Sequence, residues 1–378
     1  MLAKNSNISI KFKDYLNKNP FSEAIPWLGG DLQTLRDTFI FDIVQAKKEN
    51  KILLPINNIL SEKFEGDYLL GILELPEKFD SLKGIVLITH GLGGSTKRFG
   101  LKRIARKLVN NGFGVLKLNL RGAGSARYLA KGNYSARCSN DIILALKKFR
   151  QLLNSEFKDY LKNKVNIPIF GVGLSLGGTI LLNACLDYNS DNSEKLIDGL
   201  ACVSSPLDLI LCSNCIERPR NFLYQKWLMQ RLKRQLWDGY RNEGIVLSKS
   251  KLSKTIKGLK TIGEFDAKFT APSWGFESLE DYYHQSSPIY RIGKLINKLP
   301  PTLLIHAKDD PWVPYKSTLN LKNSLSDSLD KLNILITDKG GHNGFHSNYG
   351  CWSDEAVKNW LLSICLLYTS PSPRDLVI

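Results

Sequence analysis

The sequence predicts an α/β protein in which a mostly parallel central sheet carries helices on both faces. From residue 84 onward, short continuous apolar segments alternate with longer segments that repeat apolar residues at helical spacing. The apolar segments lack the polar–apolar alternation of a half-exposed strand, so we expect strands buried on both faces. The 378 residues are 43% hydrophobic and 23% charged, which excludes disordered, collagen-like and coiled-coil proteins.

The predicted elements follow one another in this pattern. An irregular segment at residues 26–35 and an antiparallel strand at 67–75 are expected ahead of the main sheet. Six buried strands are expected at residues 84–90, 113–120, 167–173, 200–204, 302–306 and 333–337. Helices are expected between the earlier strands, at residues 97–110, 138–153 and 176–186. Strands that alternate with helices of this length favour parallel pairing.

The alternation stops at residues 206–299, where the chain is basic, aromatic and mostly helical by pattern. We therefore predict a helical cap, or lid, inserted between two strands of the sheet. The predicted domains are an N-terminal lead-in at 1–66, a core at 67–205 and 300–366, this cap, and a tail at 367–378. The tail contains Ser-Pro-Ser-Pro and is expected to lie outside the fold.

The net charge of +16 at pH 7 is concentrated in the predicted cap. Residues 212–260 contain twelve Lys and Arg against three Asp and Glu, a net charge of +9. No helix-turn-helix, zinc-finger or RNP-type motif accompanies these charges, so no nucleic-acid partner is expected. A solvated helical face is the simplest interpretation, and an anionic substrate or peripheral contact with an anionic membrane is the alternative. The apolar residues that would support membrane contact are Phe222, Leu223, Trp227, Leu228, Leu232 and Trp237.

Targeting and redox features favour the cytoplasm. The sequence has no run of 18 apolar residues, and residues 1–20 lack an apolar leader segment. Seven cysteines are too few and too scattered for a disulfide framework, which fits a reducing compartment. Cys212-x-x-Cys215 has no second ligand pair nearby, so we expect neither a metal nor another cofactor. A cytoplasmic protein, at most peripheral to a membrane, is therefore predicted.

The strongest functional signal is the G-x-S-x-G motif in Gly171-Val-Gly173-Leu-Ser175-Leu-Gly177-Gly178. A predicted strand precedes it and a predicted helix follows it, which is the context that a nucleophilic serine on a sharp turn requires. Ser175 is therefore the predicted nucleophile. Two backbone N–H groups are expected to form the oxyanion hole, those of Leu176 and of Leu92 in the glycine-rich loop at 90–94.

A serine hydroxyl needs a base, and the chain has five histidines: His90, His284, His306, His342 and His346. In hydrolases with this type of serine turn the chain order is serine, acid, histidine, which excludes His90 and leaves it as a loop-ordering residue. His342 follows the 333–337 strand in a glycine-rich loop and is the predicted base, with His346 as the alternative. His306 is expected to be buried, and His284 to be structural.

The predicted acid is Asp310, which follows the 302–306 strand in the sequence Lys308-Asp309-Asp310-Pro311-Trp312. Asp309 is the alternative. Both carboxylates could instead cap a helix that begins near Pro314. Asp338 lies close to the histidine loop in the sequence and is interpreted as a turn residue.

Together these features resemble the α/β-hydrolase superfamily and, within it, the hydrolase-4 branch of YheT-like and ABHD-like esterases. The resemblance covers about residues 26–362. It rests on Gly30-Asp31-Leu32-Gln33-Thr34-Leu35, Asn119-Leu120-Arg121-Gly122, the Ser175 motif, Asp310-Pro311 and Gly340-Gly341-His342-Asn343-Gly344-Phe345. Asp31 stands where the branch often has His, and Thr179 where it often has Asn. These departures bear on substrate fit and not on the triad.

The resemblance implies an α/β-hydrolase that cleaves carboxylic esters through an acyl-enzyme, without a cofactor. Ser175 would attack the ester carbonyl, His342 would accept its proton, and Asp310 would orient the imidazole. The expected substrate is a small-molecule or lipid ester with a short- to medium-chain acyl group or of acylglycerol type; eukaryotic relatives act on acylglycerols or phospholipids. Thioesterase, lipase or acyltransferase chemistry with the same residues stays open, as does a catalytically silent binding protein.

Overall fold

The computed structural model describes residues 11–39, 50–57, 66–77, 82–155, 167–188, 195–243, 249–325 and 331–369. Its centre is an eight-stranded sheet with the strand order β1-β2-β4-β3-β5-β6-β7-β8. The strands are β1 (Asn50–Ile56), β2 (Asp67–Glu74), β3 (Gly84–Thr89), β4 (Phe113–Asn119), β5 (Ile169–Leu174), β6 (Gly199–Val203), β7 (Thr302–Ala307) and β8 (Leu332–Thr337). This strand order is that of the α/β-hydrolase fold, which the sequence predicts.

The sheet is parallel from β4 to β8, while β2 pairs antiparallel with both β1 and β4. Strands β3 to β7 are buried along their whole length, which agrees with their uninterrupted apolar sequences. Strand β1 lies in the segment that we predict to be a lead-in. It is an edge strand with three exposed residues and a proline, and its sequence therefore lacks the signal of a buried strand.

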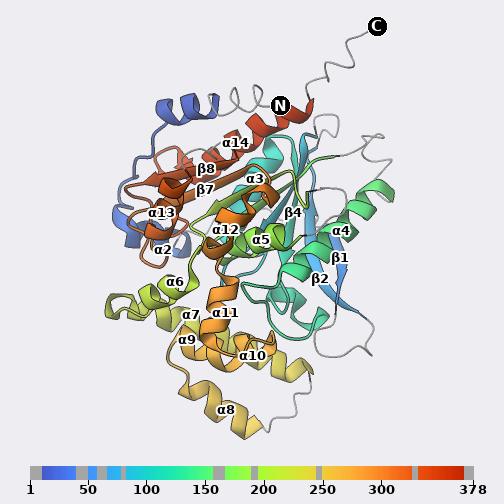
Figure 1. Ribbon diagram of the computed structural model, residues 1–378, viewed down its shortest axis with the longest axis vertical. Coiled ribbons are helices and arrows are strands. Elements are labelled where there is room, and N and C mark those ends of the chain that lie inside the picture. Colours follow the sequence, from blue (N-terminus) through green and yellow to red (C-terminus); the bar gives the residue numbers. More distant parts are fainter. Residues whose placement is uncertain are drawn as a thin grey trace.

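Helices cover both faces of the sheet (Figure 1). One face is covered by α4 (Ser139–Ser155), α5 (Leu176–Asp187), α12 (Ile289–Leu295) and α13 (Lys316–Ser324), and the other by α3 (Phe99–Asn110) and α14 (Trp352–Thr369). The irregular segment expected at 26–35 is wrong in part, because α2 (Gly29–Phe39) begins within it. The buried residue of α2 is Gln33, a polar side chain, so the helix shows no apolar stripe in the sequence.

The segment between β6 and β7 is helical and lies below the sheet in Figure 1. Its longer helices are α6 (Leu209–Ile216), α7 (Phe222–Glu243), α8 (Lys249–Gly258) and α11 (Leu279–Ser286), with short helices α9 (Ile262–Phe265) and α10 (Ala271–Ser273). The cap has an apolar cluster of its own, to which Leu228, Leu232 and Phe265 contribute. By contrast, Ile292 of α12 joins the core cluster, so the end of the insertion packs on the body.

Within the described residues, none of the helices combines the length and apolarity needed to cross a membrane. Helix α14 continues to Thr369, beyond the predicted start of the tail at 367. The rest of that tail lies outside the described residues.

Candidate active site

The topology brings four loops to one edge of the sheet. Ser175 follows β5, Asp310 follows β7, His342 follows β8, and the glycine-rich loop at 90–94 follows β3. These four strands run parallel in one sheet, with β6 between β5 and β7, so their carboxyl ends share an edge. The predicted site residues, far apart in the sequence, therefore lie together beneath the cap.

Ser175 occupies a strained turn between β5 and α5. Its backbone angles are φ 54° and ψ −130°, a region that non-glycine residues rarely adopt. The turn needs glycine on both sides: a Cβ at residue 173 would overlap the backbone of Gly178, and a Cβ at residue 177 would lie 2.6 Å from the Thr89 carbonyl oxygen. The Ser175 N–H donates to the Val203 carbonyl at 2.9 Å, which ties the turn to β6.

A continuous hydrogen-bond chain joins the three predicted side chains. The Ser175 Oγ lies 2.9 Å from Nε2 of His342, and Nδ1 of His342 lies 2.8 Å from Oδ2 of Asp310. With Nδ1–H donating to the carboxylate, the Nε2 lone pair faces the serine hydroxyl. The other oxygen of Asp310 accepts from the backbone N–H groups of Trp312 and Val313, at 2.8 and 2.9 Å. The carboxylate therefore caps its own turn and orients the imidazole.

The neighbouring carboxylates, Asp309 and Asp338, make contacts elsewhere. Asp309 Oδ1 accepts from the Gly341 N–H at 2.9 Å and so holds the backbone of the histidine loop. Burial raises the pKa of Asp309. Asp338 is exposed and pairs with Lys308 at 2.6 Å. Of the carboxylates considered as the acid, Asp310 is the one in contact with the His342 ring.

The predicted oxyanion loop is ordered by buried polar groups. His90 Nε2 accepts from the Leu120 N–H at 3.2 Å, and Nδ1 lies 2.9 Å from the Gly91 carbonyl oxygen, so the ring is neutral with its proton on Nδ1. Burial lowers the pKa of His90 to about 4. The Tyr134 hydroxyl accepts from the Gly93 N–H at 2.7 Å. Leu92, between these anchors, lines the same pocket as Leu176 and Ser175.

Sequence reasoning missed two residues of α2 that position the histidine loop. The Thr34 hydroxyl accepts from the His342 N–H at 2.8 Å and donates to the Gly30 carbonyl at 2.6 Å. The Gln33 amide donates to the His346 carbonyl at 3.0 Å and accepts from the His346 N–H at 2.6 Å. Both belong to the Gly30–Leu35 motif, which in the sequence served as a family marker with no role attached.

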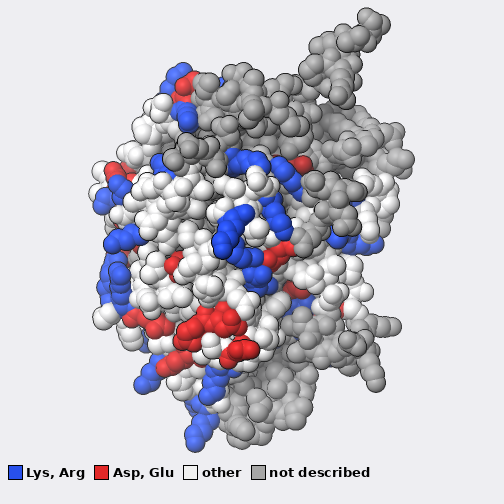
Figure 2. Space-filling view, in the orientation of Figure 1, with Lys and Arg blue, Asp and Glu red and all other residues white. Residues whose placement is uncertain are grey.

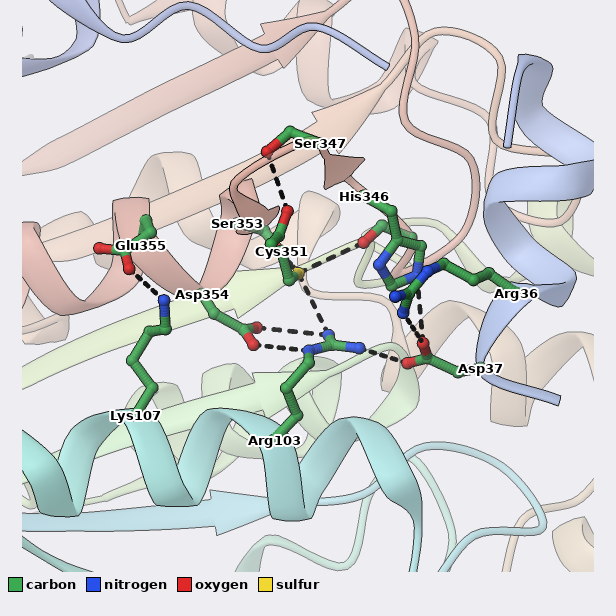
Figure 3. A network of polar contacts seen from close by, with 12 residues as sticks. Arg36, Asp37, Arg103, Lys107, His346, Ser347, Cys351, Ser353, Asp354 and Glu355 are labelled. Carbon is green, nitrogen blue, oxygen red and sulfur yellow. Dashed lines mark hydrogen bonds and ion pairs between the residues drawn. The ribbon is translucent and has the colours of Figure 1, made fainter. Parts of the chain in front are cut away.

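His346, the alternative base, lies in a different environment (Figure 3). Its Nε2 is 3.2 Å from Asp37 Oδ1, and Asp37 also binds Arg103 of α3. Arg103 bridges further to Asp354 of α14, 2.7 Å from its Nε. Burial, together with Arg103 and Arg36, lowers the pKa of His346 to about 2. This network joins α2, α3 and α14, and the neutral His346 ring is part of it.

The remaining histidines lie apart from the serine. His306 is buried with Nδ1 3.0 Å from the Thr318 hydroxyl, and burial lowers its pKa to about 4. His284 of the cap stacks on Tyr290, with ring centroids 4.6 Å apart. Within the described ranges, no group of three or more His, Cys, Asp and Glu side chains is placed to hold a metal ion.

Ser175 and His342 open into a pocket of about 280 Å³ between the body and the cap. Its cap wall is mostly apolar and includes Leu209, Ile216, Trp227, Leu228, Leu232 and Phe265. Asp266 also lines the pocket and accepts from the hydroxyls of Tyr283 and Thr270, at 3.0 and 2.7 Å. Burial raises the pKa of Asp266 to about 6.

The two residues that depart from the family pattern both make structural contacts. Asp31 accepts from Arg220 at 2.8 Å and from the Tyr224 hydroxyl at 3.0 Å, which connects α2 to the cap. The Thr179 hydroxyl donates to the Pro206 carbonyl at 2.7 Å, at the point where the chain enters the cap. Each departure therefore lies at the junction between body and cap.

Comparison with known proteins identifies the family of this chain. Residues 80–346 match the Hydrolase_4 family, described as serine aminopeptidase, S33. The chain is 30% identical over 312 residues to an abhydrolase domain-containing protein of Dictyostelium discoideum, covering 78% of this chain and 70% of that protein. It is 31% identical over 202 residues to the putative esterase YheT of Escherichia coli, covering 51% of this chain and 55% of that protein.

Two further comparisons agree. A monoacylglycerol lipase of Saccharomyces cerevisiae is 26% identical over 288 residues, covering 74% of this chain and 58% of the lipase. The match thus spans between 55% and 70% of the length of these three relatives. Among solved structures, an esterase of Pyrococcus furiosus superimposes with a TM-score of 0.50 at 14% identity, covering 83% of this chain and 90% of the esterase, which supports the fold. The chain belongs to the Hydrolase_4 family of α/β-hydrolases.

Proposed function

We propose that the protein is a serine hydrolase that cleaves carboxylic esters through the triad Ser175, His342 and Asp310. The observation that carries this proposal is the unbroken Ser175–His342–Asp310 hydrogen-bond chain at the floor of a largely apolar pocket. The names of the relatives, an esterase and a monoacylglycerol lipase, support an ester as the substrate. A silent binding protein would have no physical need for a base aligned on a strained serine.

In this proposal Ser175 Oγ attacks the ester carbonyl carbon while its proton passes to His342 Nε2. The backbone N–H groups of Leu92 and Leu176 stabilise the negative charge that develops on the carbonyl oxygen. His342 then protonates the leaving alcohol, which departs and leaves the acyl group on Ser175. A water molecule, deprotonated by His342, attacks the acyl-enzyme and releases the acid. Asp310 holds the imidazole orientation and stabilises its protonated form.

The apolar cap wall supports a short- to medium-chain acyl group or an acylglycerol as substrate. The same residues would also serve a thioesterase, a lipase or an acyltransferase, because these reactions share the acyl-enzyme. The molecule that accepts the acyl group from the acyl-enzyme distinguishes these reactions: water in the hydrolases and an alcohol in the transferase. None of the seven cysteines, all of which lie in the described ranges, takes part in a disulfide bond.

The test uses a fluorophosphonate probe and a panel of esters of graded chain length, with acyl-CoA and monoacylglycerols included. We expect covalent labelling and ester cleavage in the natural sequence and neither in Ser175→Ala. Labelling of another residue, or cleavage that persists in Ser175→Ala, would refute the proposal. Ser155→Ala serves as a control, since the exposed Ser155 hydroxyl donates to the Gln151 carbonyl within α4 and Ser155 is not among the residues that line the pocket.

We propose, in addition, a peripheral membrane contact at the start of α7. The structure narrows the surface expected from the sequence, because Leu228 and Leu232 are buried and Trp227 and Trp237 pack against the cap cluster. Phe222 and Leu223 are the exposed pair, at 62% and 75%. The exposed basic residues beside them in the sequence are Arg218, Arg220 and Lys226. Acidic side chains gather over the cap near α10 and α11 in Figure 2, so the positive charge is not spread evenly.

Sedimentation with vesicles tests this contact. Binding is expected to require anionic lipid, to weaken with added salt, and to fall in the double variant Arg218→Glu/Lys226→Glu. Phe222→Ser should weaken binding to the same vesicles at any salt concentration. Lys322→Glu is the matched control, an exposed charge reversal on α13. Equal binding by all variants, or none to anionic vesicles, would exclude the contact.

A further inference from the structure

Arg98, which lines the pocket, and its neighbour Arg231 have no acidic partners among the described residues. Arg98, just before α3, and Arg231 of α7 both lie against the ring of Trp227, with guanidinium carbons 5.1 and 4.2 Å from its centroid. Each also reaches the same carbonyl oxygen, that of Gly93, at 3.4 Å. In the part of the chain that the structure describes, no carboxylate lies within ion-pair distance of either side chain.

Two other buried or half-buried arginines are each held by two carboxylates. Arg103 is held between Asp37 and Asp354, and Arg121 between Asp67 and Asp141. Such pairing is the ordinary solution, because a cation removed from water is costly without a counter-charge. Arg98 and Arg231 differ from these two arginines in this respect.

Part of the hydrogen-bonding capacity of these two arginines is unused. The buried Nε of Arg231 has no hydrogen-bond partner. The aliphatic part of the Arg231 side chain packs on Gly93, where an added Cβ would lie 3.1 Å from the Arg231 Cβ. Burial, with the field of Arg231, lowers the pKa of Arg98 to about 10, and burial also lowers the pKa of Arg231. Both side chains keep their charge at neutral pH, and each retains N–H donors for an acceptor from outside the chain.

The pair lies where a substrate would be held. Arg98 and Trp227 line the same pocket as Ser175 and Leu92. Gly93, which both arginines contact, is the residue after Leu92, the predicted oxyanion donor. A ligand that fills this pocket from Ser175 would therefore meet Arg98, and Arg231 lies beside Arg98 at the same Gly93 carbonyl.

We propose that Arg98 and Arg231 form a subsite for an oxyanion, a phosphate or carboxylate group carried by the ester substrate itself. Guanidinium groups bind both kinds of oxyanion in two-point geometry, and the Trp227 ring, which both cations contact, helps to hold them in place. This inference rests on the proposed ester hydrolysis and specifies its substrate class: an ester with a negative charge near the scissile bond.

Paired esters test the subsite and locate the charge. On the alcohol side the pair is 1-octanoylglycerol and 1-octanoylglycerol 3-phosphate; on the acyl side it is 4-nitrophenyl butyrate and 4-nitrophenyl hydrogen glutarate. In at least one pair we expect a higher kcat/KM for the charged ester, with the preference falling as salt is added. Arg98→Gln and Arg231→Gln should each reduce that preference about tenfold, mainly through KM. Arg231→Lys should keep part of it.

Arg234→Gln is the matched control, an exposed arginine on the same helix, and should leave the preference nearly intact. Thermal unfolding of each variant checks that the ratio is measured on folded protein. Charged esters that are never preferred, or a preference that both glutamine variants retain, would overturn the subsite. Inhibition by inorganic phosphate without any preference for charged esters would also overturn it, since the site would then bind a free anion. If the unaltered protein shows no Ser175-dependent cleavage of either the neutral or the charged esters, the proposed ester hydrolysis itself is refuted.

Discussion

The two walls of the pocket are built on different principles. On the sheet wall, the polar atoms around Ser175 bind one another: His342 to Asp310, Asp310 to backbone N–H groups, and His90 to Leu120. On the cap wall, an apolar cluster lies beside Arg231, which, like Arg98 of the body next to it, has no acidic partner among the described residues. Polar groups that bind one another are held in position for a reaction, whereas charged groups without a partner in the protein are available to bind a ligand. In our proposal the body therefore performs the chemistry, and the cap, together with Arg98, selects the substrate.

The largest effects should come from the sheet wall and should not depend on the substrate. Ser175→Ala and His342→Ala are each expected to reduce kcat/KM by about 10³-fold or more, equally for charged and neutral esters. The double variant should be little worse than either single one, because the residues act as a unit. Steady-state kinetics with the paired esters measures all three. Near-normal activity of His342→Ala, with loss in His346→Ala, would show that the wrong histidine has been assigned.

The two adjacent aspartates separate orientation from loop support. Asp310→Asn is expected to cost as much as loss of the histidine, because an amide facing Nδ1 favours the wrong tautomer. Asp309→Asn should be milder, since an amide oxygen can still accept the Gly341 N–H. Comparison of kcat for the two variants is the measurement. A reversed order would move the acid to Asp309.

The strands and the serine turn could be predicted from the sequence because their signals are local. A continuous apolar run defines a strand such as β3, and glycines on either side of Ser175 define its turn. The roles of Thr34 and Gln33 could not be predicted, because their partners lie about 310 residues further along the chain. The inward position of Trp227 on α7 could not be predicted for a related reason: its ring packs against Trp312, which follows β7 much further along the chain.

Stability should fall as the pH is lowered from about 6.5 to 4, because three buried histidines bind protons more readily in the unfolded chain. His90 and His306 have a pKa of about 4 and His346 one of about 2 when folded, against about 6.5 when unfolded, and Asp266, with its pKa raised to about 6, opposes them in part. The folded state binds fewer protons between these values, so the free energy of unfolding decreases as pH falls from about 6.5 to 4. Each histidine accounts for at most about 3 kcal/mol.

Denaturant unfolding at several pH values measures this decrease. His306→Asn removes one titrating group and should flatten the curve in that window, whatever its effect on absolute stability. His284→Asn, in the cap, is the control and should leave the slope unchanged. An unaltered slope in His306→Asn would contradict the assignment.

The support that α2 gives to the histidine loop should have an intermediate effect. Thr34→Val removes the hydroxyl that accepts the His342 N–H and keeps the shape of the side chain. We expect kcat to fall about 10- to 100-fold with KM nearly unchanged, because the imidazole loses its fixed position. Thr34→Ser should restore most of the activity. Equal loss in both variants would point to packing and not to the hydrogen bond.

The smallest effect should come from the ion pair that joins the two walls. Arg220 and Asp31 are 57% and 52% exposed, and a pair so accessible to water contributes about 0–1 kcal/mol. Asp31→Asn should therefore shift the free energy of unfolding by less than about 1 kcal/mol, no more than Asp338→Asn does at the exposed Lys308 pair. The apolar part of the junction is more substantial, since Tyr224 and Trp227 contact Trp312, whose ring lies 4.4 Å from that of His342. If Asp31→Asn instead changed kcat/KM more than tenfold, the cap would be held by charge, and the division of labour between the walls would not stand.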